Sequence, residues 1–246
     1  MNEQALPGGF VSDAVLVEGT VRKPPPRDRD FVRGLLRHFE ERGWDGAPRF
    51  LGADDRGREM LSFVDGVVPW RQEGEPPSVR SEPSLAAVAR QVRRFHDLTA
   101  GTALAGADEV VCHNDLSPRN TVYREDDGVL LPVAFIDWDI AGPGRRIHDV
   151  AHVCWQYPGL GPGLADPVAA ARLVRVVADA YGLADRSALV DTILWWQNRC
   201  WRGIDAAADA GDAAMIRLRR LGTVNAVRAA HDWTRDHRAL FERALR

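Results

Sequence analysis

The sequence is almost devoid of lysine. Lys23 is the single lysine among 32 lysine and arginine residues, so planar guanidinium groups stand at nearly every cationic position. An ammonium group is a compact point charge and does not bind as a guanidinium fork does. Lys23 is therefore a candidate binding residue, with chance survival of one lysine as the alternative.

Cysteine pairs, long apolar runs and a leader-like start are also missing. The three cysteines, Cys112, Cys154 and Cys200, are odd in number and lack paired spacing, which argues against a disulfide framework and fits reduced thiols. No run approaches the roughly 18 apolar residues of a spanning helix, so no membrane association is expected. Residues 1–10 lack the basic and apolar regions of a signal peptide. We therefore expect a cytoplasmic protein.

Positive charge does not dominate either. The formal net charge is −3, which gives no blanket of positive potential, so we expect no nucleic-acid partner. The chain has 246 residues, of which 45% are hydrophobic and 27% charged. That composition is typical of a globular protein with one large domain or two lobes.

The first 66 residues predict a small unit of strands and one helix. A Glu18-Gly19 turn between two short apolar runs predicts a hairpin over residues 15–22. Asp28 and Asp30 favour a helix start and Gly43 a helix stop. The apolar residues between them recur at helical spacing, at Val32, Leu35, Leu36 and Phe39. A further strand is predicted at 60–64.

The rest of the chain reads as mostly helical. Residues 71–84 are polar and rich in proline, which is typical of a surface linker. A helical stripe follows from Leu85 to Leu98, and strands are predicted at 110–111 and 129–136. From about residue 146 the pattern is helical. The sequence thus predicts an α+β fold with a sheet-bearing N-lobe, residues 1–66, and a larger C-lobe, residues 67–246.

One polar stretch has the spacing that phosphoryl transfer requires. Asp115 is followed five residues later by Asn120, and Asp137 follows the next predicted hairpin. Three oxygen ligands can thereby point into one cleft, where one carboxylate orients a hydroxyl and the other two groups hold Mg²⁺. His113 fits a role in bracing this loop by hydrogen bonds. The alternative is a polar turn, since Asn, Asp, Ser and Pro are turn formers.

This stretch resembles the aminoglycoside phosphotransferase family, small-molecule kinases of the protein-kinase-like fold. His113, Asp115 and Asn120 match its H-x-D-x-x-x-x-N pattern, and residues 136–139 match its I-D-W-D segment. The resemblance implies a bilobal fold, ATP or GTP as phosphoryl donor, and Mg²⁺. It implies Asp115 as catalytic base and Asn120 and Asp137 as metal ligands. Residues 94–98 and the Asp149 helix start, which would steady the catalytic loop, are also similar to the family.

In the N-lobe the resemblance is looser. Gly8, Gly9 and Ser12 resemble the family's short nucleotide loop, whose backbone would approach the phosphates. Lys23 resembles the third-strand lysine that contacts the α and β phosphates. Strand alternation places Val21 and Lys23 on one face and Arg22 on the other, and Arg22 stays the competing phosphate contact. The resemblance places the lobe connection, with backbone hydrogen bonds to the base, around Phe63 and Val64.

Two departures from the family keep a second function open. The helix glutamate that usually pairs with the lysine is missing, because the matching turn reads Phe31-Val32-Arg33-Gly34. Asp28 or Asp30 could substitute, or the lysine is held differently. The short N-terminus also predicts an abbreviated or missing first strand. The alternative function is a nucleotide-binding, pseudokinase-like regulatory module without phosphotransfer.

Two unrelated motifs compete with this interpretation. His148, His152 and Cys154 follow each other at helical spacing that a zinc ion could use, although the glutamate of zinc hydrolases is missing. Cys112 beside His113 could be a thiol nucleophile, but a cysteine after two valines at a strand end is usually a buried apolar residue.

The acceptor is sought in the C-terminal helices. Asp205, Asp209 and Asp212 are spaced to stack on one helix face, where they could attract a cationic acceptor; a solvated face with Asp212 as a helix cap is the simpler alternative. Asp139 is a further possible acceptor contact. The nearby tryptophans form either core or a substrate wall.

We thus expect a Mg-dependent kinase that phosphorylates a hydroxyl of a small molecule. Candidate acceptors are an aminoglycoside, a macrolide, or a metabolite such as choline, homoserine or a sugar derivative. The sequence does not distinguish among these, between ATP and GTP, or among oligomeric states.

Overall fold

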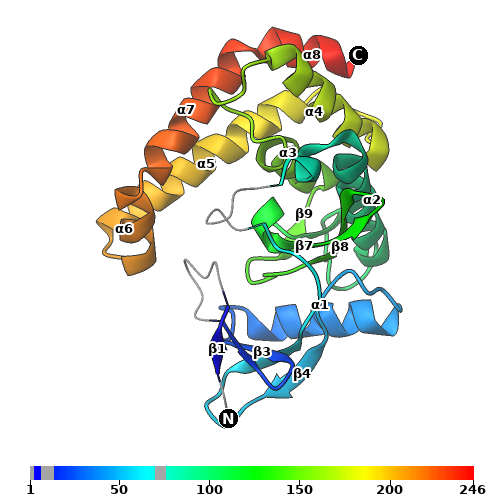
Figure 1. Cartoon of the computed structure of the whole chain (residues 1–246), viewed down its shortest axis with the longest axis vertical. Helices are drawn as coiled ribbons and strands as arrows, with labels where there is room; N and C mark the ends of the chain where they lie inside the picture. The colour runs from blue at the N-terminus through cyan, green and yellow to red at the C-terminus, as the bar shows by residue number, and fades with distance from the viewer. Residues whose placement is uncertain (1–2, 7–13, 70–75) are drawn as a thin grey trace.

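The computed structural model describes residues 3–6, 14–69 and 76–246. A small sheet with one helix forms the lower part in Figure 1, and a mostly helical part lies above it. The strands are β1 Gln4–Ala5, β2 Val15–Val17, β3 Thr20–Lys23, β4 Phe50–Ala53, β5 Glu59–Ser62, β6 Val110–Cys112, β7 Thr121–Asp126, β8 Val129–Phe135 and β9 Gly142–Gly144. The helices are α1 Arg29–Glu41, α2 Glu82–Thr99, α3 Arg146–Gln156, α4 Pro167–Tyr181, α5 Leu189–Asp209, α6 Ala213–Arg220, α7 Thr223–Asp236 and α8 Arg238–Leu245, with 3₁₀ turns at Pro77–Arg80 and Pro118–Asn120.

The N-terminal sheet has five antiparallel strands in the order β1-β2-β3-β5-β4. The predicted hairpin is confirmed, since Glu18 and Gly19 adopt φ values of 49° and 75° between β2 and β3, as a tight hairpin turn requires. The first strand is abbreviated to Gln4–Ala5, as predicted. Strand β5 begins one residue before the predicted range and ends at Ser62.

Helix α1 forms as predicted and links the two lobes through its apolar face. The Asp28 carboxylate caps it by accepting a hydrogen bond from the Phe31 amide at 3.2 Å. Phe39 is fully buried and packs on Trp138 of the C-lobe, with ring centroids 5.1 Å apart. The hydrophobic core is therefore continuous from α1 into the C-lobe.

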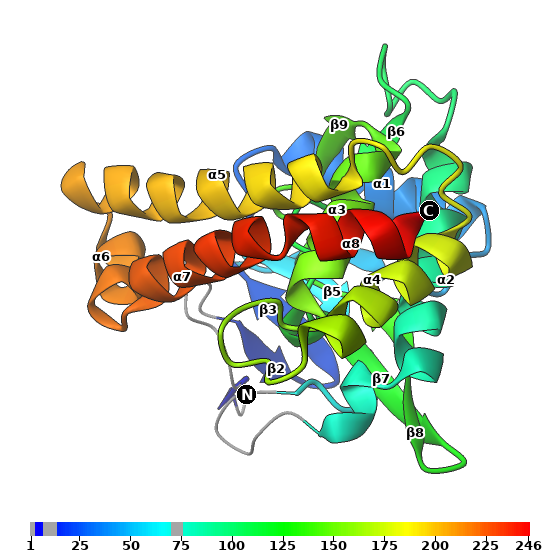
Figure 2. The ribbon, with the colours of Figure 1, turned by 90° about the horizontal axis from the view of Figure 1, so that it is seen from above.

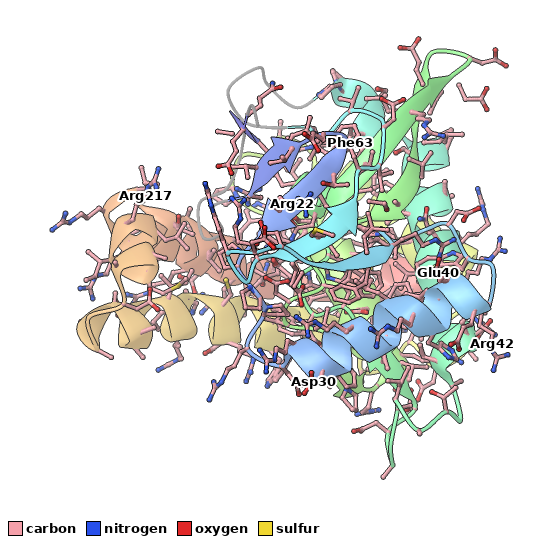
Figure 3. All side chains as sticks on the ribbon, turned by 90° about the horizontal axis from the view of Figure 1, so that it is seen from below. Arg22, Asp30, Glu40, Arg42, Phe63 and Arg217 are labelled. Atoms are coloured by element: carbon pink, nitrogen blue, oxygen red, sulfur yellow. The ribbon has the colours of Figure 1, made fainter. Side chains whose placement is uncertain are left out.

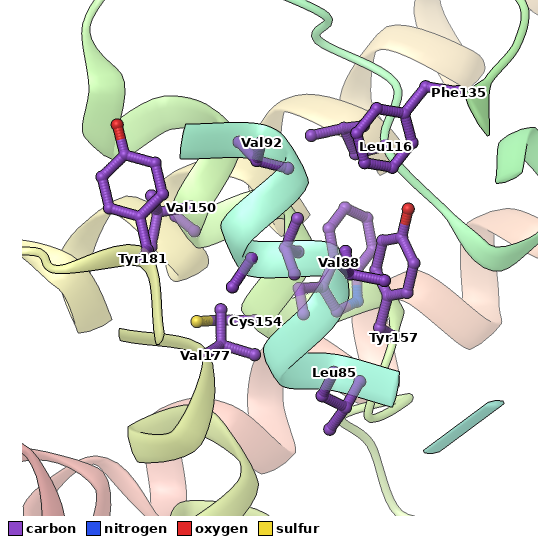
Figure 4. Close-up of a cluster of buried hydrophobic side chains, with 14 of the residues drawn as sticks. Leu85, Val88, Val92, Leu116, Phe135, Val150, Cys154, Tyr157, Val177 and Tyr181 are labelled. Atoms are coloured by element: carbon purple, nitrogen blue, oxygen red, sulfur yellow. The ribbon is translucent and has the colours of Figure 1, made fainter. Parts of the chain in front are cut away.

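The C-lobe core is built around α2. Figure 4 shows α2 with Leu85, Val88 and Val92 surrounded by side chains of α3 and α4 and by Leu116 and Phe135. The predicted linker over 71–84 is wrong for its described part, because Val79 is fully buried in a 3₁₀ turn and α2 already begins at Glu82. Residues 71–75 lie outside the described part. Burial of Val79 requires this segment to pack on the lobe.

Helices α5, α6 and α7 form an arm that leaves the C-lobe. Seen from above, α5 and α7 run side by side and α6 closes their far end (Figure 2). In the first view the tip of the arm lies level with the space between the lobes (Figure 1). Within residues 3–6, 14–69 and 76–246, every helix is too short or too polar to span a bilayer.

We propose that the lobe boundary lies between residues 66 and 67. Val67 exchanges two backbone hydrogen bonds of 2.8 Å with Tyr123 on β7, which ties it to the C-lobe. Gly66 approaches the same residue so closely that a Cβ atom would lie 2.5 Å from the Tyr123 carbonyl oxygen. Its φ of 148° also favours glycine.

Candidate active site

The loop from His113 to Asn120 follows the buried strand β6, which pairs with β9. The His113 ring is fully buried and joins two segments. Its Nδ1 accepts from the Asp115 amide at 3.3 Å, and its Nε2 donates to the Ile136 carbonyl at 3.1 Å. These two roles require a neutral ring, and burial lowers the pKa of His113 accordingly. His113 thereby connects the loop to the end of β8.

Asp149 anchors the same loop from α3. Its carboxylate is fully buried and accepts from the backbone amides of His113 at 2.7 Å and Asn114 at 3.0 Å. It also accepts from His96 Nε2 at 3.1 Å. Burial by itself would raise the pKa of Asp149, but the His96 hydrogen bond and the nearby backbone donors lower it. Asn114 adopts a left-handed φ of 65°, which these hydrogen bonds hold in place.

Asp115 and Asn120 lie side by side at the end of this loop. The Asn120 Nδ2 group donates to Asp115 Oδ2 at 2.8 Å and to the Asp115 backbone oxygen at 2.8 Å. Burial, together with the charge of Asp137, raises the pKa of Asp115 to about 7. A carboxylate with such a pKa can accept a proton near neutral pH.

Asp137 follows β8 and meets the single lysine. Its φ of 65° turns the chain sharply after Ile136, whose amide donates to the Asn120 carbonyl at 2.9 Å. Lys23 Nζ, at the end of β3, lies 2.8 Å from Asp137 Oδ1 and 2.6 Å from Asp139 Oδ1. Burial would lower the pKa of Lys23, but the two carboxylates outweigh it and raise the pKa. A charged lysine therefore links the N-lobe sheet to the C-lobe site.

Asp139 was expected as a possible acceptor contact, and that role stays a prediction. In the structure its carboxylate accepts a hydrogen bond from Lys23 Nζ. Strand alternation was predicted correctly, since Lys23 is 6% exposed and faces Asp137. Arg22 projects from the other face of β3, and its Nε and Nη1 atoms are buried without a hydrogen-bond partner among the described residues (Figure 3).

Sequence reasoning missed one ion pair beside Lys23. Arg33, in the turn of α1 where a glutamate was sought, donates from Nε to Glu59 Oε1 at 2.8 Å. Glu59 is only 2% exposed and lies directly opposite Lys23 across β3 and β5. The suggested substitutes are engaged elsewhere, because Asp28 caps α1 and Asp30 lies 3.9 Å from Arg29. The expectation that the lysine is held differently is confirmed.

The predicted nucleotide-loop residues Gly8, Gly9 and Ser12 lie outside the described residues. Phe63 and Val64 follow β5 in the connection to the C-lobe, where Phe63 is 43% exposed and Val64 half-buried (Figure 3). Exposure of a large aromatic side chain at the lobe connection leaves it available to a planar ligand.

Helix α5 carries a cysteine and two of the acidic residues singled out in the sequence. Burial, and then the charge of Asp115, raise the pKa of the Cys200 thiol to about 11. Asp205 and Asp209 share one side of α5, but both bind Arg219 of α6, at 3.2 and 2.6 Å. Asp212 lies beyond the end of α5 and caps α6 by accepting from the Met215 amide. The simpler alternative, with Asp212 as a helix cap, is therefore confirmed, and the three carboxylates do not form one stack.

The tryptophans of α5 divide between core and surface. Trp196 is buried and donates to the His148 carbonyl at 2.7 Å. Trp195 is 45% exposed, stacks on the His148 ring at 5.5 Å and carries the Arg199 guanidinium 5.4 Å from its ring centre. Core packing is thus confirmed for Trp196, and a substrate wall at the exposed Trp195 stays a prediction.

The competing motifs do not form sites. His152 donates to the Leu116 carbonyl at 2.8 Å, and Cys154 is buried against Val174, while the His148 ring stacks on Trp195. The zinc interpretation is therefore wrong. Cys112 is fully buried and its thiol pKa is strongly raised, mainly by burial, which rules out a reactive thiolate.

The oxygen donors fit a hard divalent cation. The structure contains no ligand. Among the described residues, the hydrogen bonds given above use Asn120 Nδ2 and Asp137 Oδ1, and they do not use Asn120 Oδ1 or Asp137 Oδ2. Mg²⁺ binds to proteins through one or two such oxygens and completes its shell with water and phosphate. Asn120 and Asp137 would therefore hold the ion.

Comparison with known proteins agrees with this geometry. The sequence profile described as "Phosphotransferase enzyme family" matches residues 42–189, more than half of the chain. A trifolitoxin immunity protein from Rhizobium leguminosarum bv. trifolii is 31% identical, and the alignment covers 87% of each chain.

Solved structures share the fold at low sequence identity. The GDP and kanamycin complex of the phosphotransferase APH(2″)-IIIa superposes with a TM-score of 0.60 and 14% identity, over 93% of each chain. Aminoglycoside phosphotransferase APH(3″)-Id from Streptomyces rimosus gives a TM-score of 0.58 and 17% identity, over 79% of this chain and 90% of that one.

Proposed function

Because the chain belongs to the phosphotransferase enzyme family, we propose that it transfers the γ-phosphoryl group of ATP or GTP to a hydroxyl of a small molecule in the presence of Mg²⁺. The observation that carries the proposal is the convergence of Asp115, Asn120, Asp137 and Lys23 on one site from three separate segments: the loop after β6, the turn after β8, and strand β3. This set provides a proton acceptor, oxygen ligands and a phosphate-binding cation.

Asp115 would orient the acceptor hydroxyl and take its proton. Its raised pKa, about 7, favours proton transfer, and the Asn120 hydrogen bond fixes one of its oxygens. The other oxygen is free to accept from the hydroxyl. His113 and Asp149 would hold the loop in this geometry through the hydrogen bonds to its backbone.

Lys23 would bind the donor phosphates, and Asn120 with Asp137 would hold the metal ion. A bound Mg²⁺ would supply the positive charge that offsets charge on the transferred group. Phe63 and Val64 would lie along the base, and Gly8, Gly9 and Ser12 stay proposed phosphate contacts.

The acceptor would bind between the catalytic loop and the arm. Since Asp205 and Asp209 already bind Arg219, the arm supports a neutral or weakly charged acceptor better than a polycation. The immunity protein counters trifolitoxin by its name, and the solved neighbours are named for aminoglycosides. We therefore propose that the acceptor is a toxic or antibiotic compound with a free hydroxyl.

Incubation with ATP or GTP, Mg²⁺ and a panel of hydroxylated compounds tests the proposal. The panel contains aminoglycosides, macrolides, neutral sugars, choline and homoserine, and nucleoside diphosphate release is measured together with the mass of the acceptor. We expect one class to gain a phosphoryl group, and the Asp115→Asn variant to leave it unmodified. Nucleotide binding without any modified acceptor across a broad panel would instead favour the regulatory module.

A further inference from the structure

Glu59 lies in an unusual place for a carboxylate. It begins β5 and pairs directly with Lys23 of β3 in the sheet register, so both side chains project from the same face. Its side chain is 2% exposed. From α1, Arg33 reaches this face and donates to Glu59 at 2.8 Å. A buried glutamate thus lies between the single lysine and the helix.

Such a pair is costly to maintain for stability alone. The free-energy cost of removing two charges from water offsets most of their mutual attraction. Apolar residues of similar volume often stabilise a fold equally well. Arg33 is itself only partly buried, at 21% exposure. A structural role therefore explains the pair poorly, and its position beside Lys23 points to the lysine.

Lys23 has more donor capacity than its present contacts use. An ammonium group has three N–H donors, and two of them meet Asp137 and Asp139. Both aspartates belong to the C-lobe side of the site, where Asp137 is the proposed metal ligand. The negative charge of Glu59 reaches this cluster too, because it acts on Asp139. Glu59 is thus the carboxylate of the sheet itself that faces the lysine.

We propose that Glu59 is the positioning residue for Lys23 in the nucleotide-bound state, with Arg33 holding Glu59 in place. The carboxylate expected from the helix is supplied by the neighbouring strand, and the helix supplies a cation instead. With Asp137 as a metal ligand, Glu59 would keep the Lys23 ammonium directed at the donor phosphates. This inference rests on the proposed function, because it assumes that Lys23 binds nucleotide.

Two variants separate positioning from stability. Glu59→Gln removes the charge at nearly constant volume. The double variant Arg33→Glu with Glu59→Arg restores an ion pair between α1 and β5 but places a cation beside Lys23. Glu3→Gln is the matched control, because it breaks the ion pairs of Glu3 with Arg56 and Arg58, on the outer part of the same sheet.

We expect Glu59→Gln to raise the Kd and KM for Mg-nucleotide about tenfold, the scale of one charged hydrogen bond, with kcat changed less than about threefold. The reversed pair should lose at least as much affinity while its Tm stays within about 3 °C of wild type. The Nζ signal of Lys23, unique in a chain with one lysine, should be sharp in the wild-type nucleotide complex and broad or multiple in both variants. Glu3→Gln should match wild type.

Recovery of nucleotide affinity and of the sharp Lys23 signal in the reversed pair would overturn the inference and leave the pair a purely structural one. Wild-type affinity in Glu59→Gln would overturn it as well. Failure of the proposed function is distinguishable, since then wild type itself would bind no Mg-nucleotide, or Lys23→Ala would bind it as well as wild type.

Discussion

Asn120 donates from one nitrogen to both the carboxylate and the backbone oxygen of Asp115, each at 2.8 Å. This bifurcated contact fixes the side chain of Asp115 relative to its own backbone. Because the amide nitrogen makes both of these contacts, the amide oxygen of Asn120 is the atom proposed for the metal ion. One side chain therefore connects the proton acceptor to the ion site.

Asp115→Asn should abolish phosphoryl transfer and leave Mg-nucleotide affinity within about threefold of wild type, because the group acts on the acceptor and not on the donor. Acceptor phosphorylation by mass spectrometry and nucleotide titration by calorimetry provide the two measurements. Turnover at the wild-type rate would remove Asp115 from the mechanism.

Asp137→Ala should lose Mg²⁺-dependent nucleotide binding as well as activity, since its carboxylate is the only anionic ligand in the proposed pair. Calorimetry with nucleotide, with and without Mg²⁺, checks this. Asn120→Ala is the comparison variant, and its Mg²⁺-dependent nucleotide affinity should fall less than that of Asp137→Ala. Unchanged affinity in Asp137→Ala would move the ion to other ligands.

Lys23→Ala should weaken nucleotide binding by about 2 to 3 kcal/mol, the scale of a hydrogen bond between charged groups. Arg22→Ala is the matched control from the opposite face of β3, and its Kd for nucleotide should change much less. If Arg22→Ala abolishes nucleotide binding while Lys23→Ala leaves the Kd unchanged, the phosphate contact belongs to Arg22.

Arg219→Ala should release the carboxylates of Asp205 and Asp209 and thereby tighten the binding of a polycation such as kanamycin. Because these groups are largely exposed, the gain should be small, about two- to fivefold. Arg220→Ala removes the same charge from the same helix and should leave the Kd unchanged. Equal gains in both variants would show an effect of net charge alone.

His152 should contribute a fall in the free energy of unfolding as the pH falls from 6.5 toward 4. Burial lowers the pKa of His152 from 6.5 to about 4, so in this range the unfolded chain binds a proton there and the folded chain does not. The His152 contribution has a slope of at most about 1.4 kcal/mol per pH unit. Buried His113 also has a lowered pKa and adds to the slope. Asp115, whose pKa is raised to about 7, contributes with the opposite sign, so the His152 contribution is measured by difference.

Denaturant unfolding of wild type and His152→Gln at pH 6.5 and 5.5 isolates the His152 contribution. Glutamine can still donate to the Leu116 carbonyl, so the variant should be folded. Its free energy of unfolding should fall less between pH 6.5 and 5.5 than that of wild type. Identical slopes in the two proteins would assign the effect to other groups.

The features that could be predicted from the sequence are those set by residues close together in the chain. The turn at Glu18 and Gly19, the apolar face of α1 and the spacing from Asp115 to Asn120 are encoded within a few residues each. The partners of Lys23 lie 114 and 116 residues away, and no periodicity carries information across that separation.

The errors have the same origin. Arg219 reaches Asp205 and Asp209 only because α6 folds back on α5, so the sequence left both carboxylates available to an acceptor. The proline-rich segment before α2 was assigned to solvent by its polarity, yet Val79 fills a place in the core. To predict the contact between Glu59 and Arg33, both the register of β5 against β3 and the packing of α1 on the sheet must be known.

Helix α6 buries none of its side chains in the described structure, and it is held to α5 through Arg219. Random substitutions in α6 therefore meet little selection from folding, whereas those around α2 and α3 disturb the core. In the proposed function the acceptor binds beside this arm. Substitutions in α6 would therefore change acceptor choice without altering the residues proposed for phosphoryl transfer. A library confined to residues 213–221 should yield mostly folded proteins, and its members would sample new acceptors from an unchanged catalytic centre.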